Sequence, residues 1–597
     1  MMLERTVFRM FDRYPVASRV IPIVVVGLLA YGWTFFFDSF NFDDSANILG
    51  ANARRNQGPI TQLLDPRGQR SLGFITFALN YRIFGPHPQA FHVTNVVIHI
   101  LTSLSLVWLV SLILSTPRFE ALRDRPLFRV VPLVAGLLFV SHPIQSQAVA
   151  YIVQRFTSLA TLFYLLSLVF YLKGRTIRSR GETKGGPLFL VLMVTSIICA
   201  IQSKEIAATI PLSVILVELL FFNRDPLWRL SLFSLIILPV ALIPLTLFGA
   251  EIFRDPAALL ARLRVQTNLP RDVYFFSELP VLLSYLKLTL LPVGQSVEHT
   301  PPIYRSFLAP PVLFSALFHL LVIGVAVFLA VGGRRGDPAK ILAGFGLLWF
   351  YVTSLVESSV IPFIDLMFEH RVYLPFAGLS MGVAGVTLLF RTERVTPWCV
   401  RGVATVTLLL TVVTIHRTGV WRTPVTLWRD AVEKSPNSSR AWNNLAYAYL
   451  KNRQPNEAIP ALLTSIDLDP GKTDVWNNLA IALDQLGIYR GRYHRVYTRF
   501  SSAEDYYTSQ TLWFANAWNN LGLVRQHVGQ YAAAIQAFRK ALEVYPDLAV
   551  ARFNLGSAAI LTGNPDLAIN EYERLLTLAP EMAATLRGII ENAKRQR

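Results

Sequence analysis

The stretch Ala441-Trp442-Asn443-Asn444-Leu445-Ala446 decides the fold of the C-terminal part of this chain, because close copies of it follow at regular intervals. The copies begin at Val475, Ala517 and Ala551, at successive steps of 34, 42 and 34 residues. From about residue 421 the chain also has the composition of soluble helices. A unit that returns at this period predicts stacked helix pairs rather than one globular core.

A step of 34 residues is typical of the tetratricopeptide repeat, a helix–turn–helix unit. Closing prolines keep the same interval, from Pro436 to Pro470 and from Pro546 to Pro580. We therefore predict that 421–597 is an α-solenoid of about four repeats, preceded by a half-repeat helix over 426–434. The second repeat carries eight extra residues within 489–507. Such arrays form a superhelix with a concave groove.

The chain before this array is far more apolar than a soluble protein. Of all 597 residues 53% are hydrophobic and 16% charged, against about 25% charged in an ordinary soluble domain. The net charge of +18 comes largely from basic residues in short loops, which is typical of membrane topology signals rather than of a nucleic-acid-binding face. The two cysteines, Cys199 and Cys399, exclude a disulfide framework and a cysteine metal site. We predict a polytopic helical membrane domain over 1–420 and no nucleic-acid partner.

Eleven apolar runs are long enough to be membrane-spanning candidates. They lie at roughly 19–37, 90–114, 129–141, 150–172, 187–203, 206–222, 230–249, 307–332, 341–360, 374–390 and 402–418. Basic loops alternate with cation-poor loops, so we predict a cytoplasmic N-terminus and a first span that is an uncleaved anchor. The odd number of spans then places the repeat array on the far side of the membrane.

Two long loops, 38–89 and 250–306, belong to the same far side. Aromatic and apolar residues over 58–85 predict an amphipathic helix on the membrane surface. The second loop mixes arginines with aromatic residues and ends in a proline-rich segment, which suits a partly ordered lid or gate. Its apolar stretch 279–292 either spans the membrane or dips into it, and the charges of the following loops favour the dip.

Asp43 and Asp44 follow the first span, within Phe40-Asn41-Phe42-Asp43-Asp44-Ser45-Ala46-Asn47. Adjacent carboxylates at a membrane surface are costly unless they are solvated, paired or functional. One interpretation is a solvated pair that caps a short helix; the other is a catalytic pair. A divalent cation could bind there, but no second ligand is identifiable in the sequence, so we assign no metal and no cofactor.

Further polar residues lie near the far-side ends of separate spans. The cations are Arg70, Arg155, Lys204 and Arg371, the carboxylates are Glu205 and Glu369, and His92, His142 and Tyr373 accompany them. Each one alone is explained by a salt bridge or by a structural hydrogen bond. Their common side and depth predict a shared polar cavity that acts on a lipid phosphate, with cations for the phosphate and a carboxylate base for an acceptor hydroxyl.

One asparagine of each repeat occupies the same position: Asn444, Asn478, Asn520 and Asn554. We predict that they form a ladder along the groove, because an amide both donates to and accepts from an extended peptide backbone. The alternative is that these asparagines pack locally within the array.

The motifs of the membrane part, taken in order, carry a family resemblance. They are Phe42-Asp43-Asp44, Arg70-Ser71-Leu72 with Asn80-Tyr81, Phe91-His92 with Asn95 and His99, His142-Pro143 with Arg155, Lys204-Glu205, and Glu369 with Arg371, Tyr373, Leu374 and Pro375. The chain resembles the transmembrane and tetratricopeptide-repeat-containing O-mannosyltransferases, which belong to the GT-C class of membrane glycosyltransferases. Two departures, Gln147 in place of a glutamate and Ser71 in place of a proline, leave the exact donor and acceptor open.

The resemblance implies that a polyprenyl-phosphate sugar, usually mannose, is the donor and that Ser or Thr hydroxyls of extracytoplasmic proteins are the acceptors. It implies an acidic residue of the first far-side loop as the base, which maps to Asp43 or Asp44. By analogy with the acidic pair of related protein mannosyltransferases we favour Asp43 as the base and Asp44 as its partner, and we assign Arg371, with Arg155 or Lys204, to the phosphate. In-line attack would invert the sugar, and the array would present the acceptor protein. The short array suggests a bacterial inner-membrane member with periplasmic repeats. A non-catalytic envelope scaffold, or transfer to a glycan or lipid, is the alternative.

Overall fold

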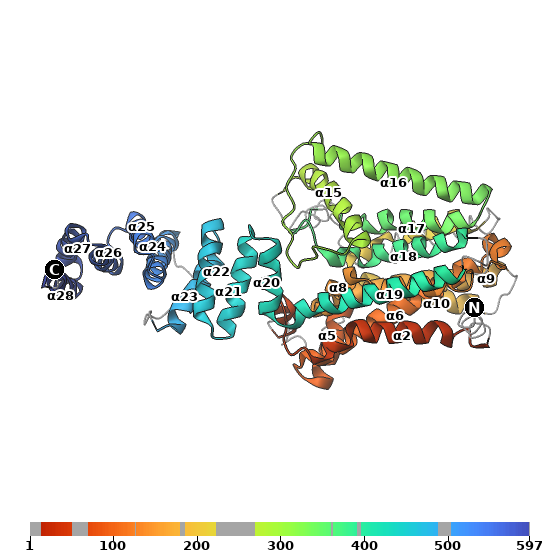
Figure 1. Cartoon of the computed structure of the whole chain (residues 1–597), viewed down its shortest axis with the longest axis horizontal. Coiled ribbons are helices and arrows are strands. Elements are labelled where there is room, and N and C mark those ends of the chain that lie inside the picture. The colour runs from red at the N-terminus through yellow and green to blue at the C-terminus, as the bar shows by residue number, and fades with distance from the viewer. Residues whose placement is uncertain are drawn as a thin grey trace. The chain divides into compact units, whose positions relative to one another are not determined.

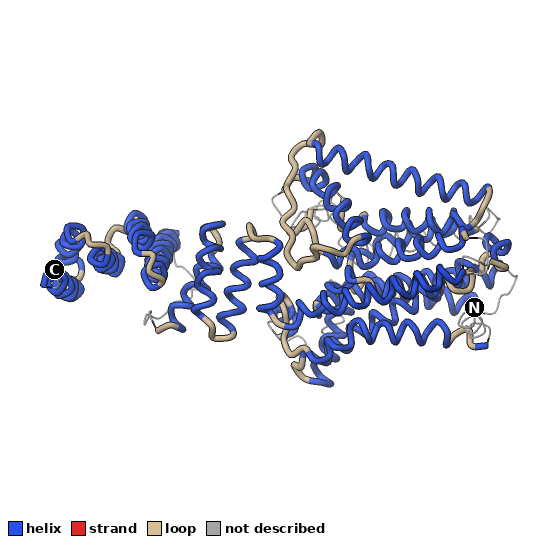
Figure 2. The backbone as a smooth tube through the Cα atoms, viewed as in Figure 1, coloured by secondary structure: helices blue, strands red, loops and turns tan. Residues whose placement is uncertain are grey.

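The computed structural model describes residues 13–49, 70–125, 127–179, 185–222, 269–359, 362–390, 396–487 and 503–595. Helices, turns and loops make up these residues, and none of the described residues forms a strand (Figure 2). The predicted all-α fold is therefore confirmed. The chain divides into two compact units, 1–430 and 431–597. The span expected over 230–249 lies outside the described residues.

The first unit is a bundle of helices, several of which run side by side along its length (Figure 1). Its helices are α2 (Ala17–Tyr31), α3 (Asp44–Ile48), α5 (Ser71–Phe84), α6 (Pro88–Leu114), α7 (Val131–Ser141), α8 (Ser146–Ala150), α9 (Arg155–Ser179), α10 (Gly186–Ile201), α11 (Ile210–Phe221), α15 (Arg271–Leu290), α16 (Pro310–Arg335), α17 (Ala339–Ser354), α18 (Tyr373–Val386), α19 (Thr396–Gly419) and α20 (Pro424–Lys434). Short 3₁₀ segments lie between them: η1 (Gly32–Phe36), η3 (Pro117–Leu122), η4 (Pro143–Gln145), η5 (Ile152–Gln154), η6 (Glu205–Thr209), η7 (Glu369–Val372), η8 (Thr387–Leu389) and η10 (Val420–Arg422).

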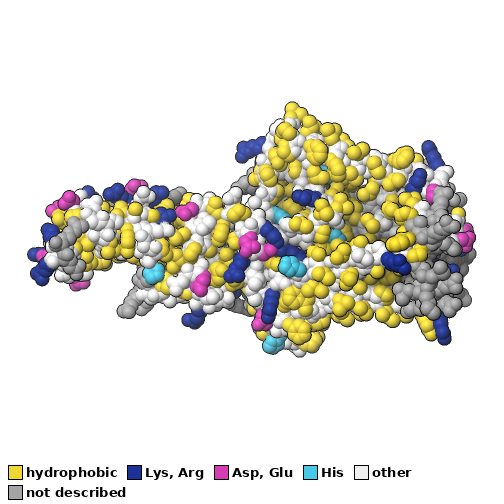
Figure 3. All heavy atoms as spheres, viewed as in Figure 1, with side chains coloured by type: hydrophobic (Ala, Val, Ile, Leu, Met, Phe, Trp, Pro, Cys, Tyr) yellow, Lys and Arg dark blue, Asp and Glu magenta, His cyan; other side chains and the backbone are white. Residues whose placement is uncertain are grey.

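Seven helices of the described residues are long and apolar enough to cross a membrane, or eight if the bent pair α7 and η4–α8 is one span. The outer helices expose large apolar side chains, such as Phe328 of α16 at 70% and Leu408 of α19 at 65%, and apolar atoms cover much of the bundle surface (Figure 3). Exposed apolar surface of this kind is suited to lipid. The chain is thus a multi-pass membrane protein.

Three of the expected spans correspond to helices that are short for a membrane crossing. Helices α10 and α17 have 16 residues each and α11 has 12. At about 1.5 Å per residue, 16 residues reach roughly 24 Å, short of the roughly 30 Å of a hydrocarbon core. The apolar run at α11 is longer than that helix because η6 takes its first residues.

Helix α15 lies inside the loop expected over 250–306. It is long and apolar enough to span a membrane. However, one residue in each half of the helix makes a polar contact at the same end of the bundle. Glu278 pairs with Arg371 near its start, and the carbonyl of Thr289 near its end accepts a hydrogen bond from His142. Figure 1 shows α15 at that end only, whereas α16 follows the length of the bundle. Helix α15 therefore packs against one end of the bundle.

Helices α17 and α18 pack closely because glycines face each other. A Cβ on Gly346 of α17 would lie 2.3 Å from the carbonyl oxygen of Gly378 in α18. Small residues at such contacts let two backbones approach, which is how helices associate where no hydrophobic effect drives them. Trp349 then fills the adjacent space and donates its indole N–H to the carbonyl of Leu374.

The second unit consists of helix pairs. Its helices are α21 (Ser439–Lys451), α22 (Pro455–Leu468), α23 (Thr473–Gln485), α24 (Ala503–His527), α25 (Tyr531–Val544), α26 (Ala549–Leu561), α27 (Pro565–Leu578) and α28 (Pro580–Arg595). The turn within each pair has a residue with positive φ at the repeat interval: Arg453, Gly487, Gly529 and Gly563. Glycine adopts a positive φ without strain, so the residue suits the backbone conformation in three of the four turns. Most of the predicted insertion over 489–507 lies outside the described residues.

The first turn of several repeats is closed by the same side-chain bond. The indole N–H of Trp442 donates to the carbonyl of Pro436 at 2.7 Å, and that of Trp476 donates to Pro470 at 2.9 Å. In the last repeat, Arg552 replaces the tryptophan, and its guanidinium donates to Pro546 at 2.6 Å. The recurring tryptophan and proline of the sequence are thus the two partners of one hydrogen bond.

Candidate active site

The polar residues of interest lie where helices are broken. The residue before a proline disfavours the α conformation, so α7 ends at Ser141, His142 is extended, and the path bends by 53° into η4 and α8. Segments η4 and η7 contact each other, as do α8 and η5. Irregular backbone in a membrane protein is tolerated where it is buried in protein or lines a polar cavity. These breaks therefore mark the candidate site.

Asp44 is fully buried at the start of α3. Its carboxylate accepts the backbone N–H of Asn41 at 3.0 Å and that of Val153 at 2.8 Å. Burial raises the pKa of Asp44 to about 8, although these two hydrogen bonds act in the opposite direction. Asp44 thus joins the first loop to the segment before α9 and is largely protonated near neutral pH.

Asp43, its neighbour, has an exposed side chain. Its backbone N–H donates to the hydroxyl of Tyr151 at 3.3 Å, and the same hydroxyl hydrogen-bonds to the Asp43 side chain. Burial, followed by the charges of the two aspartates, raises the pKa of Tyr151 well above its ordinary value, so the phenol stays protonated as a donor. The two aspartates therefore differ in environment: Asp43 faces outward and Asp44 is enclosed.

Aromatic side chains surround this pair of aspartates. Tyr151 stacks on Trp421, with ring centroids 5.4 Å apart and an angle of 20°. Phe42 contacts Tyr151 on one side and Trp428 on the other. Asn41 donates its amide to the carbonyl of Trp421 at 2.7 Å. The first loop and the end of α19 thus meet at the same end of the bundle, and the aromatic side chains hold Asp43 in place.

Arg155, predicted to contact a phosphate, is fully buried and binds neutral oxygens. Its guanidinium donates to Asn95 at 2.7 Å, to Asn80 at 2.6 Å and to the carbonyl of Phe91 at 3.0 Å. It also lies over the ring of Phe77, 4.6 Å from the centroid. Arg155 therefore ties α5 and α6 to the start of α9, beneath the loop that carries Asp44.

The other three predicted cations each pair with a carboxylate. Arg70 lies 3.2 Å from Glu205, Lys204 lies 2.6 Å from Glu357, and Arg371 lies 3.7 Å from Glu278. Arg70 and Glu205 are partly exposed, whereas the other two pairs are almost fully buried. Burial lowers the pKa of Lys204 against the opposing effect of Glu357. Sequence reasoning missed Glu357 and Glu278, because each is an isolated glutamate that belongs to no motif.

Glu369 fixes the segment that follows α15. Its carboxylate accepts the backbone N–H of Ser296 at 2.6 Å, the side chain of Gln295 at 2.9 Å and the imidazole of His299 at 3.0 Å. Gln295 also donates to the carbonyl of Pro143 at 3.0 Å. Part of the expected lid is thus bonded to the helix breaks, and Glu369 supports the site instead of facing a ligand.

The predicted supporting residues are buried inside the bundle. His142 donates to the carbonyl of Thr289 at 3.1 Å and accepts the N–H of Ile144 at 3.1 Å. The Tyr373 hydroxyl bonds to His99 at 2.7 Å. His92 is 1% exposed and meets the ring of Phe37 edge-on. These three side chains support the site from within.

The repeat asparagines bond between repeats. Asn478 donates its amide to Asn443 at 2.8 Å, and Asn554 donates to Asn519 at 2.9 Å. Each bond joins one repeat to the previous one across 35 residues, and the insertion separates the two bonded pairs. Asn520 is 4% exposed and Asn444 is half-buried. The amides thus take part in packing, and a peptide ladder along them stays a prediction.

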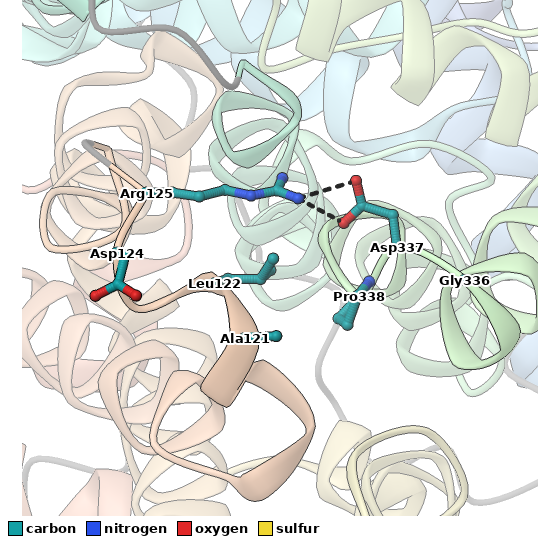
Figure 4. A pocket seen from close by; sticks show the side chains of 7 residues that line it. All are labelled: Ala121, Leu122, Asp124, Arg125, Gly336, Asp337 and Pro338. Carbon is teal, nitrogen blue, oxygen red and sulfur yellow. Dashed lines mark hydrogen bonds and ion pairs between the residues drawn. The ribbon is translucent and has the colours of Figure 1, made fainter.

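A cavity of about 470 Å³ lies at the opposite end of the bundle, lined by residues that follow η3 and α16 (Figure 4). There Arg125 makes two hydrogen bonds of 3.1 Å to Asp337, while Asp124 points away from them. This cavity is remote from Asp43, because α6 and α18 run from the helix breaks to this end. The bonds from Arg125 to Asp337 join the segment after η3 to the segment after α16. This cavity is not the candidate site.

Comparison with known proteins agrees with this architecture. Residues 427–459 and 513–581 match tetratricopeptide-repeat models. The protein O-mannosyl-transferase TMTC3 of Mus musculus is 22% identical over 94% of this chain and 64% of its own length, and the Homo sapiens protein gives the same values. The protein O-mannosyl-transferase F38B6.6 of Caenorhabditis elegans is 23% identical over 72% of this chain and 60% of its own. The chain is therefore similar to the TMTC proteins over most of its length.

The chain spans 64% of the length of the TMTC3 proteins that it matches. The aspartate pair, the three ion pairs and Glu369 lie in the helical unit that the TMTC resemblance covers. Among the described residues, no group of three or more His, Cys, Asp or Glu side chains is placed to hold a metal ion.

Proposed function

We propose that this chain transfers mannose from a polyprenyl phosphate to Ser or Thr hydroxyls of extracytoplasmic proteins. The supporting observation is Asp43, an exposed carboxylate held by Tyr151 at the end of the bundle where the helices break. The names of the relatives support mannose transfer to proteins. We place the chain in a bacterial inner membrane, with undecaprenyl phosphate as the lipid and with Asp43 and the repeats on the periplasmic side.

The proposed reaction is a single displacement at the anomeric carbon. The acceptor oxygen attacks C1 of mannose while the bond from C1 to the phosphate oxygen breaks, so the configuration inverts. The phosphate leaves with the electron pair of that bond, and Asp43 takes the proton of the acceptor hydroxyl. Asp44 suits the partner role, because a second ionised carboxylate beside the base would be repelled.

The leaving phosphate is assigned to Arg70, Lys204 and Arg371. Each cation already has a carboxylate partner, so a bound phosphate competes with that partner rather than meeting a bare charge. Arg70 is the most accessible of the three, with 37% of its side chain exposed. The N–H donors of Arg155 are occupied by neutral oxygens. Arg155 therefore attracts the phosphate through its positive charge and does not hydrogen-bond to it. The divalent cation considered for the aspartates is not part of this proposal.

The repeat unit is assigned to the acceptor protein. Superhelical repeat arrays bind extended or folded partners through their concave surface, and the inter-repeat asparagine bonds keep neighbouring repeats in register. We assign Asn444, Asn478, Asn520 and Asn554 to contacts with the backbone of the acceptor protein. Recruitment by the repeats would raise the local concentration of acceptor hydroxyls near Asp43.

Asp43→Asn and Asp43→Ala, assayed for transfer from a short-chain polyprenyl-phosphate mannose to a Ser/Thr peptide, test the proposal. We expect both to lose about 10²–10⁴-fold in kcat, the usual contribution of a general base. Asp124→Asn is the control, because Asp124 is an exposed aspartate at the opposite end of the bundle. Activity near wild type in both Asp43 variants would remove Asp43 as the base. Silent Asp43 variants, together with a strong effect of deleting 431–597, would favour the scaffold alternative.

A further inference from the structure

Two buried polar side chains meet beside the ion pairs, and the mechanism above does not use them. Gln147 of α8 is 1% exposed and His370 of η7 is 6% exposed. The side-chain carbonyl of Gln147 accepts the backbone N–H of His370 at 2.7 Å. The other amide atom of Gln147, Nε2, and the ring atom Nδ1 of His370 are buried without a hydrogen-bond partner.

These unpartnered atoms lie beside one hydrogen bond. Nε2 of Gln147 is attached to the same carbon as the oxygen that makes that bond, and Nδ1 belongs to the residue that donates it. Buried polar atoms in proteins are nearly always bonded, so an unbonded pair needs an explanation such as a bound molecule. Stacking of the His370 ring on Phe368, at 5.2 Å and 29°, holds the imidazole in this position.

The surroundings place the pair near the proposed phosphate site. His370 directly precedes Arg371 in η7, and Arg371 is one of the cations assigned to the phosphate. Both side chains stand on short segments at the helix breaks, α8 and η7. A group attached to a phosphate at Arg371 would lie close to His370, its neighbour in the chain, and to Gln147, which bonds to His370.

We propose that Gln147 and His370 form a subsite for a sugar hydroxyl of the lipid-linked donor. The amide Nε2 is a donor, and an imidazole nitrogen accepts or donates according to its tautomer. A hydroxyl both donates and accepts, so it satisfies the pair in either case. Both side chains are uncharged partners in this arrangement, which suits a neutral hydroxyl, while the neighbouring cations suit the phosphate. The inference rests on the proposed function, because it assigns the sugar end of the same donor.

Equilibrium binding of two probes to the full-length protein tests the subsite. The probes are farnesyl phosphate and farnesyl-phosphate mannose, measured in the Asp43→Asn background so that the sugar is not consumed. The ratio of the two dissociation constants isolates the contribution of the sugar. His370→Phe removes the ring nitrogens and leaves the backbone N–H that bonds to Gln147, while a somewhat larger aromatic ring remains to stack on Phe368. Gln147→Leu removes the amide, and thermal unfolding reports whether it also disturbs the fold.

We expect the unmodified background to prefer the mannosylated probe and each variant to lose about fivefold to tenfold of that preference, the value of one net hydrogen bond. Affinity for farnesyl phosphate should not change. His416→Phe, on the exposed face of α19, is the control for the substitution. Two results overturn the subsite: an unchanged preference in His370→Phe, or an equal loss of affinity for both probes, which would assign the pair to the phosphate. If neither probe binds the background protein, the donor proposal itself fails.

Discussion

The hydroxyl of Tyr151 bonds to Asp43 twice: it accepts the backbone N–H at 3.3 Å and it bonds to the side-chain carboxylate. Two residues farther on, the backbone N–H of Val153 donates to Asp44 at 2.8 Å. The turn at 151–153 thus holds both aspartates, but by different groups. The side-chain hydroxyl of Tyr151 bonds to the exposed Asp43, and the backbone amide of Val153 bonds to the buried Asp44.

Tyr151→Phe should lower kcat about tenfold with little change in the KM for the donor. The ring keeps its stacking on Trp421, but the base loses a donor that stabilises its ionised form. A hydrogen bond to a charged group is worth about 1.5–3 kcal/mol, so the acid limb of kcat/KM should move up by about one pH unit. Tyr164→Phe, which removes a buried hydroxyl inside the bundle, is the control. An unmoved pH profile in Tyr151→Phe would leave the tyrosine a packing role only.

Asp44→Asn should destabilise the fold by about 1–3 kcal/mol, because an amide nitrogen would face a backbone N–H. The wild-type protein should also lose stability as pH rises. Burial holds the pKa of Asp44 near 8 in the folded state, against about 4 unfolded. Between these values the folded state keeps a proton that the unfolded chain releases, so stability falls with rising pH by up to about 1.4 kcal/mol per unit. Thermal unfolding from pH 5 to 8 should show this slope in wild type and a flatter one in Asp44→Asn.

Gly346→Ala should lower the stability of the bundle, because its Cβ would lie 2.3 Å from a backbone oxygen of α18. Overpacking of this kind costs about 1–3 kcal/mol. Gly324→Ala on α16 is the matched control, since a Cβ there meets nothing within 4 Å and alanine is the better helix former. We expect a lower Tm for the first variant and an unchanged or higher Tm for the second. Equal behaviour of the two would contradict the close packing of α17 on α18.

Arg453→Gly should stabilise the repeat unit by about 0.5–1 kcal/mol. Arg453 has a φ of 57°, a left-handed conformation that costs an L residue about 1–2 kcal/mol, part of which glycine returns as entropy of the unfolded chain. Arg539→Gly, at an exposed position inside α25, should have the opposite sign and cost about 1 kcal/mol. Hydrogen exchange of the repeat amides in the full-length protein distinguishes the two outcomes.

The sequence predicted the features that depend on local periodicity. The interval of 34 residues placed helix pairs in the second unit, and the apolar runs placed spanning helices such as α6 and α16. Both signals are written along the chain, since a helix buries a face whose residues are neighbours in sequence. The lengths of α10, α11 and α17 were less predictable, because packing and not hydropathy decides where those helices end.

The roles of individual polar residues depended on contacts that no local pattern contains. Arg155 donates its hydrogen bonds to neutral oxygens, such as those of Asn95 and Phe91. Arg371 also donates to backbone carbonyls, those of Leu366 and Asp365. However, it lies 3.7 Å from the carboxylate of Glu278 as well. Asn478 and Asn554 have the regular spacing of a ladder but bond to the preceding repeat. A hydrogen-bond partner that lies many residues away is decided by how the helices pack, so spacing alone does not identify it.

The sequence by itself determined that this chain is helical, that a membrane bundle precedes a repeat array, and that a pair of aspartates follows the first span. Hydropathy, repeat interval and charge are properties of neighbouring residues, and they suffice for these conclusions. Only the tertiary structure decided which aspartate is exposed. Asp43 and Asp44 are adjacent and chemically identical, and they differ because Val153 and Tyr151, more than a hundred residues away, enclose one carboxylate and leave the other open.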